Sequence, residues 1–155
     1  MKKNTRKREY SHVWVLLLGL AVMVQCSLLF AGAYLVLFIL GTLWFLVTIC
    51  PNCRGYNSKA CPSGYGLLSA RLTKKAKNPD HNRAFKRNIA SVAVQWFVPV
   101  LGAGFCLYQD FDVYLAGTLV IFCLVAFVWL PLNSKQGGCA RCPQRKDCAW
   151  SKAGK

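Results

Sequence analysis

Acidic residues and histidines are scarce in this sequence. Its 155 residues include only five Asp and Glu and two His, against twenty Lys and Arg. Hydrophobic residues make up 55% of the chain, a share that suits neither a soluble globule nor a disordered tail. The length predicts one domain, over residues 1–155. The apolar excess with basic flanks predicts a membrane protein.

Charged residues are absent from three long runs, at 13–49, 88–109 and 113–134. A helical span needs about 20 apolar residues, so the first run has room for two spans. It is also too long for a cleaved signal peptide. We expect an all-α membrane protein of four transmembrane helices, in two hairpins, with the first tight turn at Ala31–Ala33. The predicted spans cover roughly residues 13–31, 33–50, 89–108 and 113–132.

Several kinds of site are missing. The predicted spans contain no Asp, Glu, Lys or Arg, which argues against a proton or ion relay through the membrane. The only histidines, His12 and His81, lie outside the interior of the predicted bundle, so bis-His haem ligation is excluded. The sequence has no P-loop, GxGxxG or Ser/His/Asp pattern. Gln25 and Gln95 are the notable polar residues in the spans, and they either bond a neighbouring helix or contact a quinone head group.

The basic residues are distributed asymmetrically. With four spans, all twenty lie on one side of the membrane, in the two tails and the central loop. The other side has two short turns, one of which carries Asp110 and Asp112. Because basic loops stay in the cytoplasm, we expect both termini and the central loop to be cytoplasmic. Tyr34, Tyr108 and Tyr114 are then expected near the outer surface.

The loop 66–88 is basic and partly apolar. Its segment "GLLSARLTKKAK" (Gly66–Lys77) places leucines among lysines and arginines, which predicts either a short amphipathic helix on the lipid headgroups or a solvated basic loop. Basic residues that flank membrane spans favour anionic lipids as a partner. Nucleic acid is the less favoured partner for the same charge.

Nine cysteines divide into two groups. Cys26, Cys106 and Cys123 fall inside spans and are interpreted as small core residues. The other six form two cytoplasmic triplets in the cysteine-rich segments 50–65 and 139–150. Each half has a basic lead-in, an uncharged hairpin and a triplet, which suggests a parallel repeat that brings both triplets to one end of the bundle. The triplets are Cys50-x2-Cys53-x7-Cys61 and Cys139-x2-Cys142-x5-Cys148.

Metal binding is the favoured role for the triplets. Static disulfides are disfavoured in the cytoplasm, which keeps thiols reduced. The four-span, quinone-linked disulfide-generating enzymes carry their cysteines on the oxidising side, after the first and third spans, whereas these triplets follow the second and fourth. Two CxxC turns can supply four thiolates to one metal, and "CPNC" resembles the knuckle of a zinc ribbon.

Iron–sulfur ligation accounts for more of the pattern than zinc does. A four-thiolate zinc site would leave Cys61 and Cys148 unused. Cys-Pro steps recur at Cys50, Cys61 and Cys142, and such steps occur beside iron–sulfur ligands. We therefore predict one or two iron–sulfur clusters, of the [4Fe–4S] type, with zinc as the alternative. The predicted ligands are Cys50, Cys53, Cys61, Cys139, Cys142 and Cys148.

In its few spans and its Cys-Pro steps, the chain resembles the membrane-bound ferredoxin-type quinol dehydrogenase subunits, although it lacks their full ferredoxin run. The resemblance implies electron transfer between quinol and a partner. We predict a small, non-catalytic redox subunit of a larger membrane oxidoreductase complex. It would relay electrons between an acidic cytoplasmic carrier and a membrane partner or quinone.

Two other functions stay open. One is a structural zinc site that makes a docking or assembly platform beneath the bundle. The other is a soft-metal transporter, since the small bacterial mercury transporters also combine thiols in spans with thiols in a loop.

Overall fold

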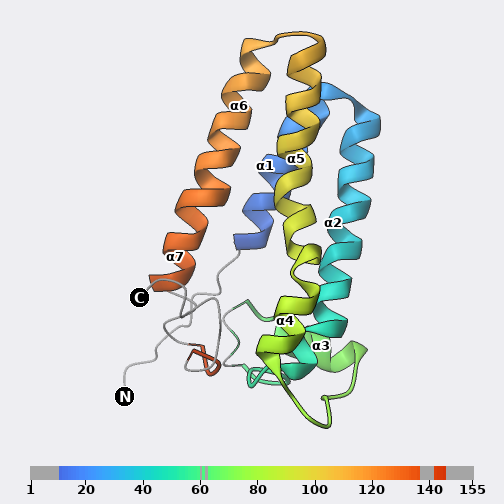
Figure 1. Ribbon diagram of the computed structural model, residues 1–155, viewed down its shortest axis with the longest axis vertical. Helices are drawn as coiled ribbons and strands as arrows, with labels where there is room; N and C mark the ends of the chain where they lie inside the picture. Colours follow the sequence, from blue (N-terminus) through green and yellow to red (C-terminus); the bar gives the residue numbers. More distant parts are fainter. Residues whose placement is uncertain (1–10, 60, 62, 137–141, 146–155) are drawn as a thin grey trace.

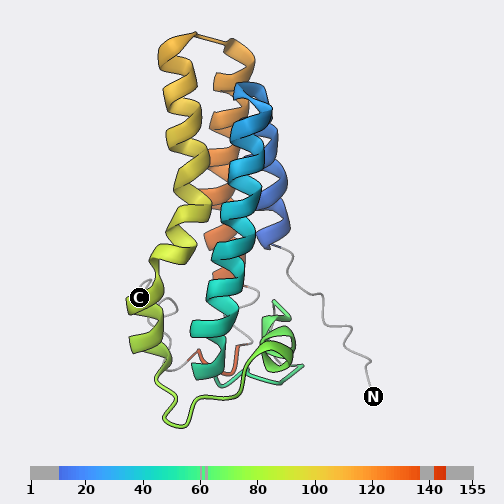
Figure 2. The ribbon, with the colours of Figure 1, turned by 90° about the vertical axis from the view of Figure 1, so that its right-hand side faces the viewer.

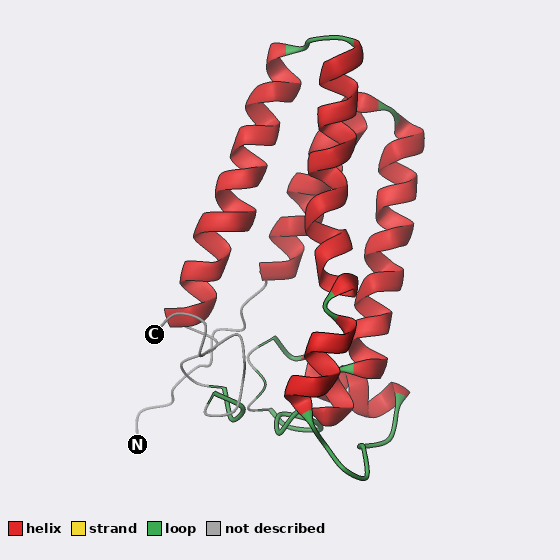
Figure 3. Cartoon of the chain, in the orientation of Figure 1, coloured by secondary structure: helices red, strands yellow, loops and turns green. Residues whose placement is uncertain are grey.

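The computed structural model describes residues 11–59, 61, 63–136 and 142–145. This part of the chain is helical and contains no strand (Figure 3). In chain order the elements are α1 (Ser11–Cys26), α2 (Leu28–Thr48), the 3₁₀ turn η1 (Cys50–Asn52), α3 (Tyr65–Leu72), α4 (His81–Asn88), α5 (Ala90–Gln109), α6 (Val113–Cys123), the π-helical segment η2 (Leu124–Trp129) and α7 (Leu130–Gln136).

The long helices form an up-and-down bundle (Figures 1 and 2). Helix α1 packs against α2, α5 and α6, and α5 also packs against α2 and α6. One end of the bundle carries η1, α3, α4 and the segment 142–145, and we call it the basic end (Figure 1). The opposite end, with the loop through Asp110 and Asp112, is called the acidic end.

Three helices in the described part are long and apolar enough to cross a membrane. They are Leu28–Asn52, His81–Gln109 and Val113–Gln136, which include the second, third and fourth predicted spans. Helix α1 is apolar but has only 16 residues, fewer than the roughly 20 that a full span needs. Tyr108 and Tyr114 lie exposed at the acidic end.

The predicted turn at Ala31–Ala33 is wrong. The chain reverses at Ser27, and these three residues lie inside α2. Ser27 is extended, and its hydroxyl accepts a hydrogen bond from the Leu29 N–H at 3.2 Å, so it caps the new helix. Alanine and glycine offer no such cap, and in membrane helices small residues serve close packing instead. Ala31 accordingly lies in the core.

This shift of the turn also moves Tyr34 away from its predicted place near the outer surface. Its side chain is buried in the centre of the bundle, with 1% exposure. The hydroxyl lies 3.2 Å from the backbone oxygens of Val15 and Gln95, to either of which it donates. Tyr34 thereby joins α2 to α1 and α5.

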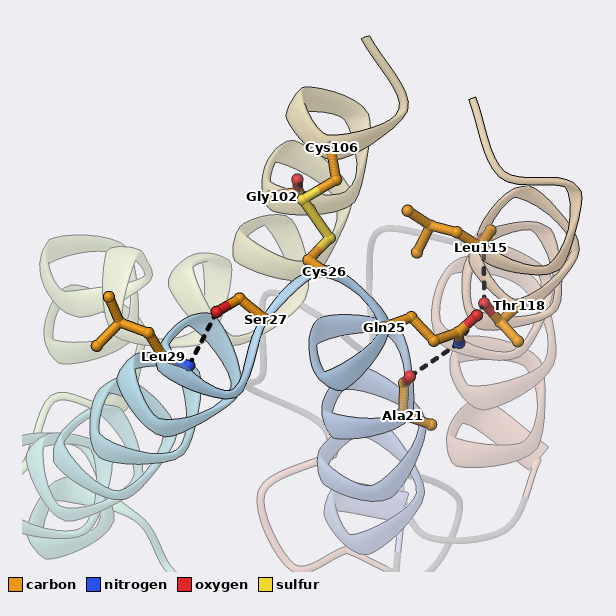
Figure 4. The surroundings of a disulfide bond; sticks show 9 residues. All are labelled: Ala21, Gln25, Cys26, Ser27, Leu29, Gly102, Cys106, Leu115 and Thr118. Carbon is orange, nitrogen blue, oxygen red and sulfur yellow. Dashed lines mark hydrogen bonds between the residues drawn. A yellow bond between two sulfur atoms is a disulfide. The ribbon is translucent and has the colours of Figure 1, made fainter. Parts of the chain in front are cut away.

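Both glutamines of the spans bond a neighbouring helix, which confirms that interpretation. The Gln95 Nε2 donates to Thr42 Oγ1 of α2 at 3.1 Å. The Gln25 Nε2 donates to Thr118 Oγ1 of α6 at 2.9 Å (Figure 4). Without water to compete, such bonds hold apolar helices together.

We predict that Gly19→Ala destabilises the bundle. A Cβ at Gly19 would overlap the hydroxyl of Tyr34 and lie 2.6 Å from its Cζ, and the buried ring is fixed by its hydrogen bonding. Overpacking of this kind costs about 1–3 kcal/mol, so the midpoint of thermal unfolding in detergent should fall. Gly32→Ala is the matched control, because its Cβ would meet nothing within 4 Å. Equal midpoints for the two variants would refute the packing described here.

Helix α3 is shorter than the predicted segment, because it ends at Leu72. Its inner face packs on α2, where the fully buried Ser69 hydroxyl donates to the Leu46 carbonyl at 2.8 Å. Leu68 and Leu72 are exposed on the other face. The helix therefore closes the basic end of α2 and holds the loop that precedes it.

A disulfide joins Cys26 to Cys106 near the acidic end (Figure 4). The interpretation of these two residues as small core cysteines is therefore wrong. Their Cα atoms lie 5.9 Å apart, within the range that a disulfide requires. Close packing of α1 and α5 makes this possible: a Cβ at Gly102 would lie 2.7 Å from Met23 Cε. Cys123 takes no part in a disulfide.

Candidate functional site

The cysteine loop starts where α2 ends. After Ile49 the chain tightens into η1, with Pro51 in its first turn. The Cys53 N–H donates to the Cys50 carbonyl at 3.0 Å, which closes the turn. The Asn52 side chain donates to the Thr48 carbonyl at 2.9 Å and so fastens the turn to the helix. Cys50 and Cys53 are thus presented from one rigid turn at the basic end.

Two glycines let the third cysteine approach this turn. The thiols of Cys53 and Cys61 both lie close enough to that of Cys50 to interact with it electrostatically. A Cβ at Gly55 would lie 3.5 Å from Cys61 Cβ and 3.7 Å from Cys53 Sγ. A Cβ at Gly66 would overlap the Gly55 carbonyl oxygen. The loop therefore folds back on the first turn of α3, and the first triplet converges.

Tyr65 covers this thiol cluster. Its ring lies 5.0 Å from that of His12 on α1 and 5.9 Å from that of Phe45 on α2, between ring centres. Burial raises the pKa of Tyr65 to about 12, and the nearby thiols of Cys50 and Cys61 add to the shift. The phenol consequently stays neutral, and the thiols of Cys50 and Cys61 lie near it.

The C-terminal cysteine segment meets the first triplet. The Gln144 side chain is buried, with 6% exposure, and its Oε1 accepts a hydrogen bond from the Arg54 N–H at 3.1 Å. Arg54 directly follows Cys53, and Gln144 lies two residues after Cys142. Residues 90 positions apart in the chain therefore bring a cysteine of each predicted triplet to the same region.

The predicted ligands fall into two sets. Cys50 is buried, and Cys53, Cys61 and Cys142 are partly exposed. None of these four belongs to a disulfide. Cys139 and Cys148 lie outside the described residues. Among the residues that the structure describes, no three His, Cys, Asp or Glu side chains form a group that could hold a metal ion.

The donor chemistry fits a thiophilic metal. Four thiols from two chain segments supply the soft ligands that iron–sulfur clusters and zinc prefer. The Gly55 N–H donates to Cys53 Sγ at 3.4 Å, and such a bond favours the thiolate over the thiol. Hydrogen bonds to ligand sulfurs also set the reduction potential of a cluster. These four thiols are therefore of the type that such a metal binds, but the described side chains do not form a metal-binding group.

Sequence reasoning missed four residues that contribute to the site. No sequence pattern identifies Gln144, because the position of a glutamine in a basic tail does not predict a hydrogen-bond partner 90 residues away. Gly55 and Gly66 flank Cys61, and their presence near a cysteine turn is a usable signal for close backbone approach. His12 was placed only at the edge of the first span, and its contact with Tyr65 needed the tertiary structure.

Comparison of the sequence with protein-family models, with curated proteins and with solved structures gives no match.

Proposed function

We propose that this chain is an integral membrane protein whose four long helical segments all cross the bilayer, with the basic end in the cytoplasm. Three helices have the required length and composition. Helix α1 is bonded on both sides, to α2 through Tyr34 and to α6 through Gln25, which supports its insertion as the fourth. Its 16 residues are about 24 Å long at 1.5 Å per residue.

Two independent features support this orientation. Basic loops are retained in the cytoplasm, and the described basic residues of the central loop lie at the basic end. The disulfide between Cys26 and Cys106 lies near the acidic end, and disulfides persist in oxidising compartments. Charge and redox chemistry therefore both support the proposal that the acidic end faces the outside.

We call Cys50, Cys53, Cys61 and Cys142 at the basic end the cysteine cap. We propose that it holds an iron–sulfur centre that relays electrons. The observation that carries this proposal is the hydrogen bond between Gln144 and the Arg54 N–H, since it brings thiols from both halves of the chain together. The predicted ligands from the first segment are Cys50, Cys53 and Cys61. Cys142, together with Cys139 and Cys148, would supply the remaining ligands.

The chain's own residues define what the cap does. Cys50 lies beneath α2 and is shielded by Tyr65, so the bundle excludes water from one side of the site. The Gly55 N–H stabilises negative charge on Cys53. When bound, a cluster would supply a one-electron redox couple.

The partners follow from size and charge. No P-loop, GxGxxG or Ser/His/Asp pattern occurs in the sequence, so we propose a redox subunit that works within a larger membrane complex. The excess of twenty basic over five acidic residues favours an acidic cytoplasmic electron carrier, because complementary charge accelerates encounter.

The test is metal and acid-labile sulfide determination on anaerobically purified protein, with an electron paramagnetic resonance spectrum. We expect brown protein that contains iron and sulfide and gives a signal on reduction or oxidation. Cys50→Ser and Cys142→Ser should each lower the iron content, because both segments contribute ligands. Cys123→Ser is the matched control and should leave it unchanged.

If Cys50→Ser removes the metal and Cys142→Ser does not, the joint site is wrong. A structural zinc site is the second candidate, because the Cys50–Cys53 turn with its N–H···S bond also suits a zinc knuckle. Colourless protein with about one zinc per chain and no sulfide would establish that function instead.

A further inference from the structure

Helix α4 presents a cationic face that the cysteine cap does not use. Arg83, Lys86 and Arg87 are all exposed and stand at the i, i+3 and i+4 positions, so their side chains leave one face of the helix. With Asp80 and Asn82 they line a shallow depression of about 590 Å³.

Within the described part of the chain, the three cationic side chains of this depression outnumber its one carboxylate, Asp80. Asp80 is the nearest acid, and its role is to cap α4, since its Oδ1 accepts a hydrogen bond from the Arg83 backbone N–H at 3.0 Å. No ion pair joins it to a basic side chain there. The depression therefore keeps a net positive charge and is suited to an anion.

The height of α4 relative to the bundle identifies the kind of anion. The Trp44 Nε1 donates to Asn88 Oδ1 at 3.0 Å, which ties the last turn of α4 to α2. The Trp44 indole is 57% exposed and the neighbouring Ile89 is 48% exposed. Exposed tryptophans mark the level of lipid headgroups, and the apolar helix α5 begins immediately after, at Ala90. Figure 2 shows α4 below the start of α5.

We propose that α4 binds the phosphate of an anionic phospholipid in the leaflet at the basic end. Arginine forks pair bidentately with phosphate oxygens, and Arg83 and Arg87 stand one turn apart to do so. The apolar surface of Trp44 and Ile89, directly above, would contact the glycerol and first acyl carbons. Basic clusters immediately cytoplasmic of a membrane helix recognise anionic lipid in this way. The inference does not depend on whether the cysteines bind a metal.

The test measures lipid binding to delipidated protein in detergent by native mass spectrometry, with phosphatidylglycerol and phosphatidylcholine titrated separately. We expect phosphatidylglycerol to bind more tightly, and Arg83→Gln/Arg87→Gln to weaken it by about tenfold or more. Lys74→Gln/Lys75→Gln removes the same charge from the neighbouring loop and should leave the binding near that of the parent protein.

Several results would overturn the site. Equal weakening by the two double variants would show attraction by net charge alone. Inorganic phosphate that displaces the lipid at low millimolar concentration would indicate a site for a free anion. A thermal melt verifies that Arg83→Gln/Arg87→Gln is folded. If it is not, Arg83→Lys/Arg87→Lys, which keeps the charge, replaces it and should weaken phosphatidylglycerol binding through loss of the bidentate fork. Unchanged affinity in that variant would refute the site. The iron content of each variant, measured in parallel, separates this result from failure of the proposed cluster.

Discussion

Gly66→Ala is expected to open the cysteine loop and expose Cys50. The Gly66 Cα faces the Gly55 carbonyl so closely that an added Cβ would overlap that oxygen, and it would also lie 3.2 Å from Cys61 Cβ. Hydrogen bonds hold Gly66 and Cys61 in place: the Asn57 N–H donates to the Gly66 carbonyl at 3.0 Å, and the Gly64 N–H donates to the Cys61 carbonyl at 3.2 Å. The backbone of the loop must therefore move away from α3.

The expected effect on reactivity is large. Overpacking against a fixed backbone costs about 1–3 kcal/mol, and each 1.4 kcal/mol changes a population about tenfold. A buried thiol reacts from locally opened states. The rate at which a maleimide modifies Cys50 should rise roughly tenfold or more, measured site by site by mass spectrometry of the metal-free protein. In metal-replete protein the iron content should fall.

Gly104→Ala is the matched control, because its Cβ would meet nothing within 4 Å. It should leave both the modification rate and the iron content unchanged. Because α3 lies outside the bundle core, Gly66→Ala should also preserve the helical circular dichroism signal. An unchanged Cys50 rate in Gly66→Ala would mean that the loop does not pack on α3 as described.

Charge and hydropathy predicted the helices well because membrane helices obey a simple rule. Uncharged runs of sufficient length have few stable structures in lipid other than a helix, since every backbone group must be bonded internally. The second, third and fourth predicted spans therefore coincide with helices α2, α5 and α6–α7 to within a few residues. The polar residues Gln25 and Gln95 were also assigned correctly to helix–helix bonding, because a polar side chain among apolar helices needs a partner.

The first turn was misplaced because two kinds of residue compete for it. Ala31-Gly32-Ala33 has the composition of a turn in water, yet in a membrane bundle small residues serve helix contact. Ser27 has one hydroxyl that caps α2, and a lone serine is a weak signal in sequence. With the turn at Ser27, Tyr34 lies six residues inside α2, about 9 Å from the helix start at 1.5 Å per residue, and it is buried in the core instead of lying at the predicted interface.

The meeting of the two cysteine segments was predicted from layout and not from any contact. The repeat placed both triplets at one end, and the Gln144–Arg54 hydrogen bond now supplies the physical link for Cys142. The sequence could not predict this hydrogen bond, because a glutamine side chain can bond to any backbone N–H that the fold brings near it. The pairing of Cys26 with Cys106 was missed for the same reason: it depends on α1 and α5 lying in contact, at Gly102 and Met23.

The disulfide connects two helices of different hairpins at the acidic end of the bundle. Cys26 ends α1, and Cys106 lies in the last turn of α5, 80 residues later in the chain. Loops of this length gain the most from a cross-link, because the link removes conformational freedom from the unfolded chain. It also holds α1, which is shorter than the three helical segments long enough to cross a membrane, against the second hairpin.

Cys26→Ser is therefore expected to lower the stability of the bundle by about 2–4 kcal/mol. The lower part of that range applies if the helices persist in the unfolded state in detergent. The measurement is the midpoint of thermal unfolding of Cys26→Ser. The midpoint of the parent protein treated with a reductant is measured in parallel and should fall by the same amount. Because the two treatments break the same bond, adding reductant to Cys26→Ser should produce no further change.

Cys123→Ser is the control, since Cys123 forms no disulfide and its replacement should leave the redox dependence intact. The same bond tests the orientation. In the proposed orientation the acidic end faces the oxidising compartment, so in cells quenched with acid and alkylated, Cys26 and Cys106 should stay unmodified until a reductant is added. Cys53 should be alkylated at once in metal-free protein. Ready alkylation of Cys26 in unreduced cells would place the acidic end in the cytoplasm. The basic end would then face the outside, and the proposed cytoplasmic partners of the cysteine cap would be wrong.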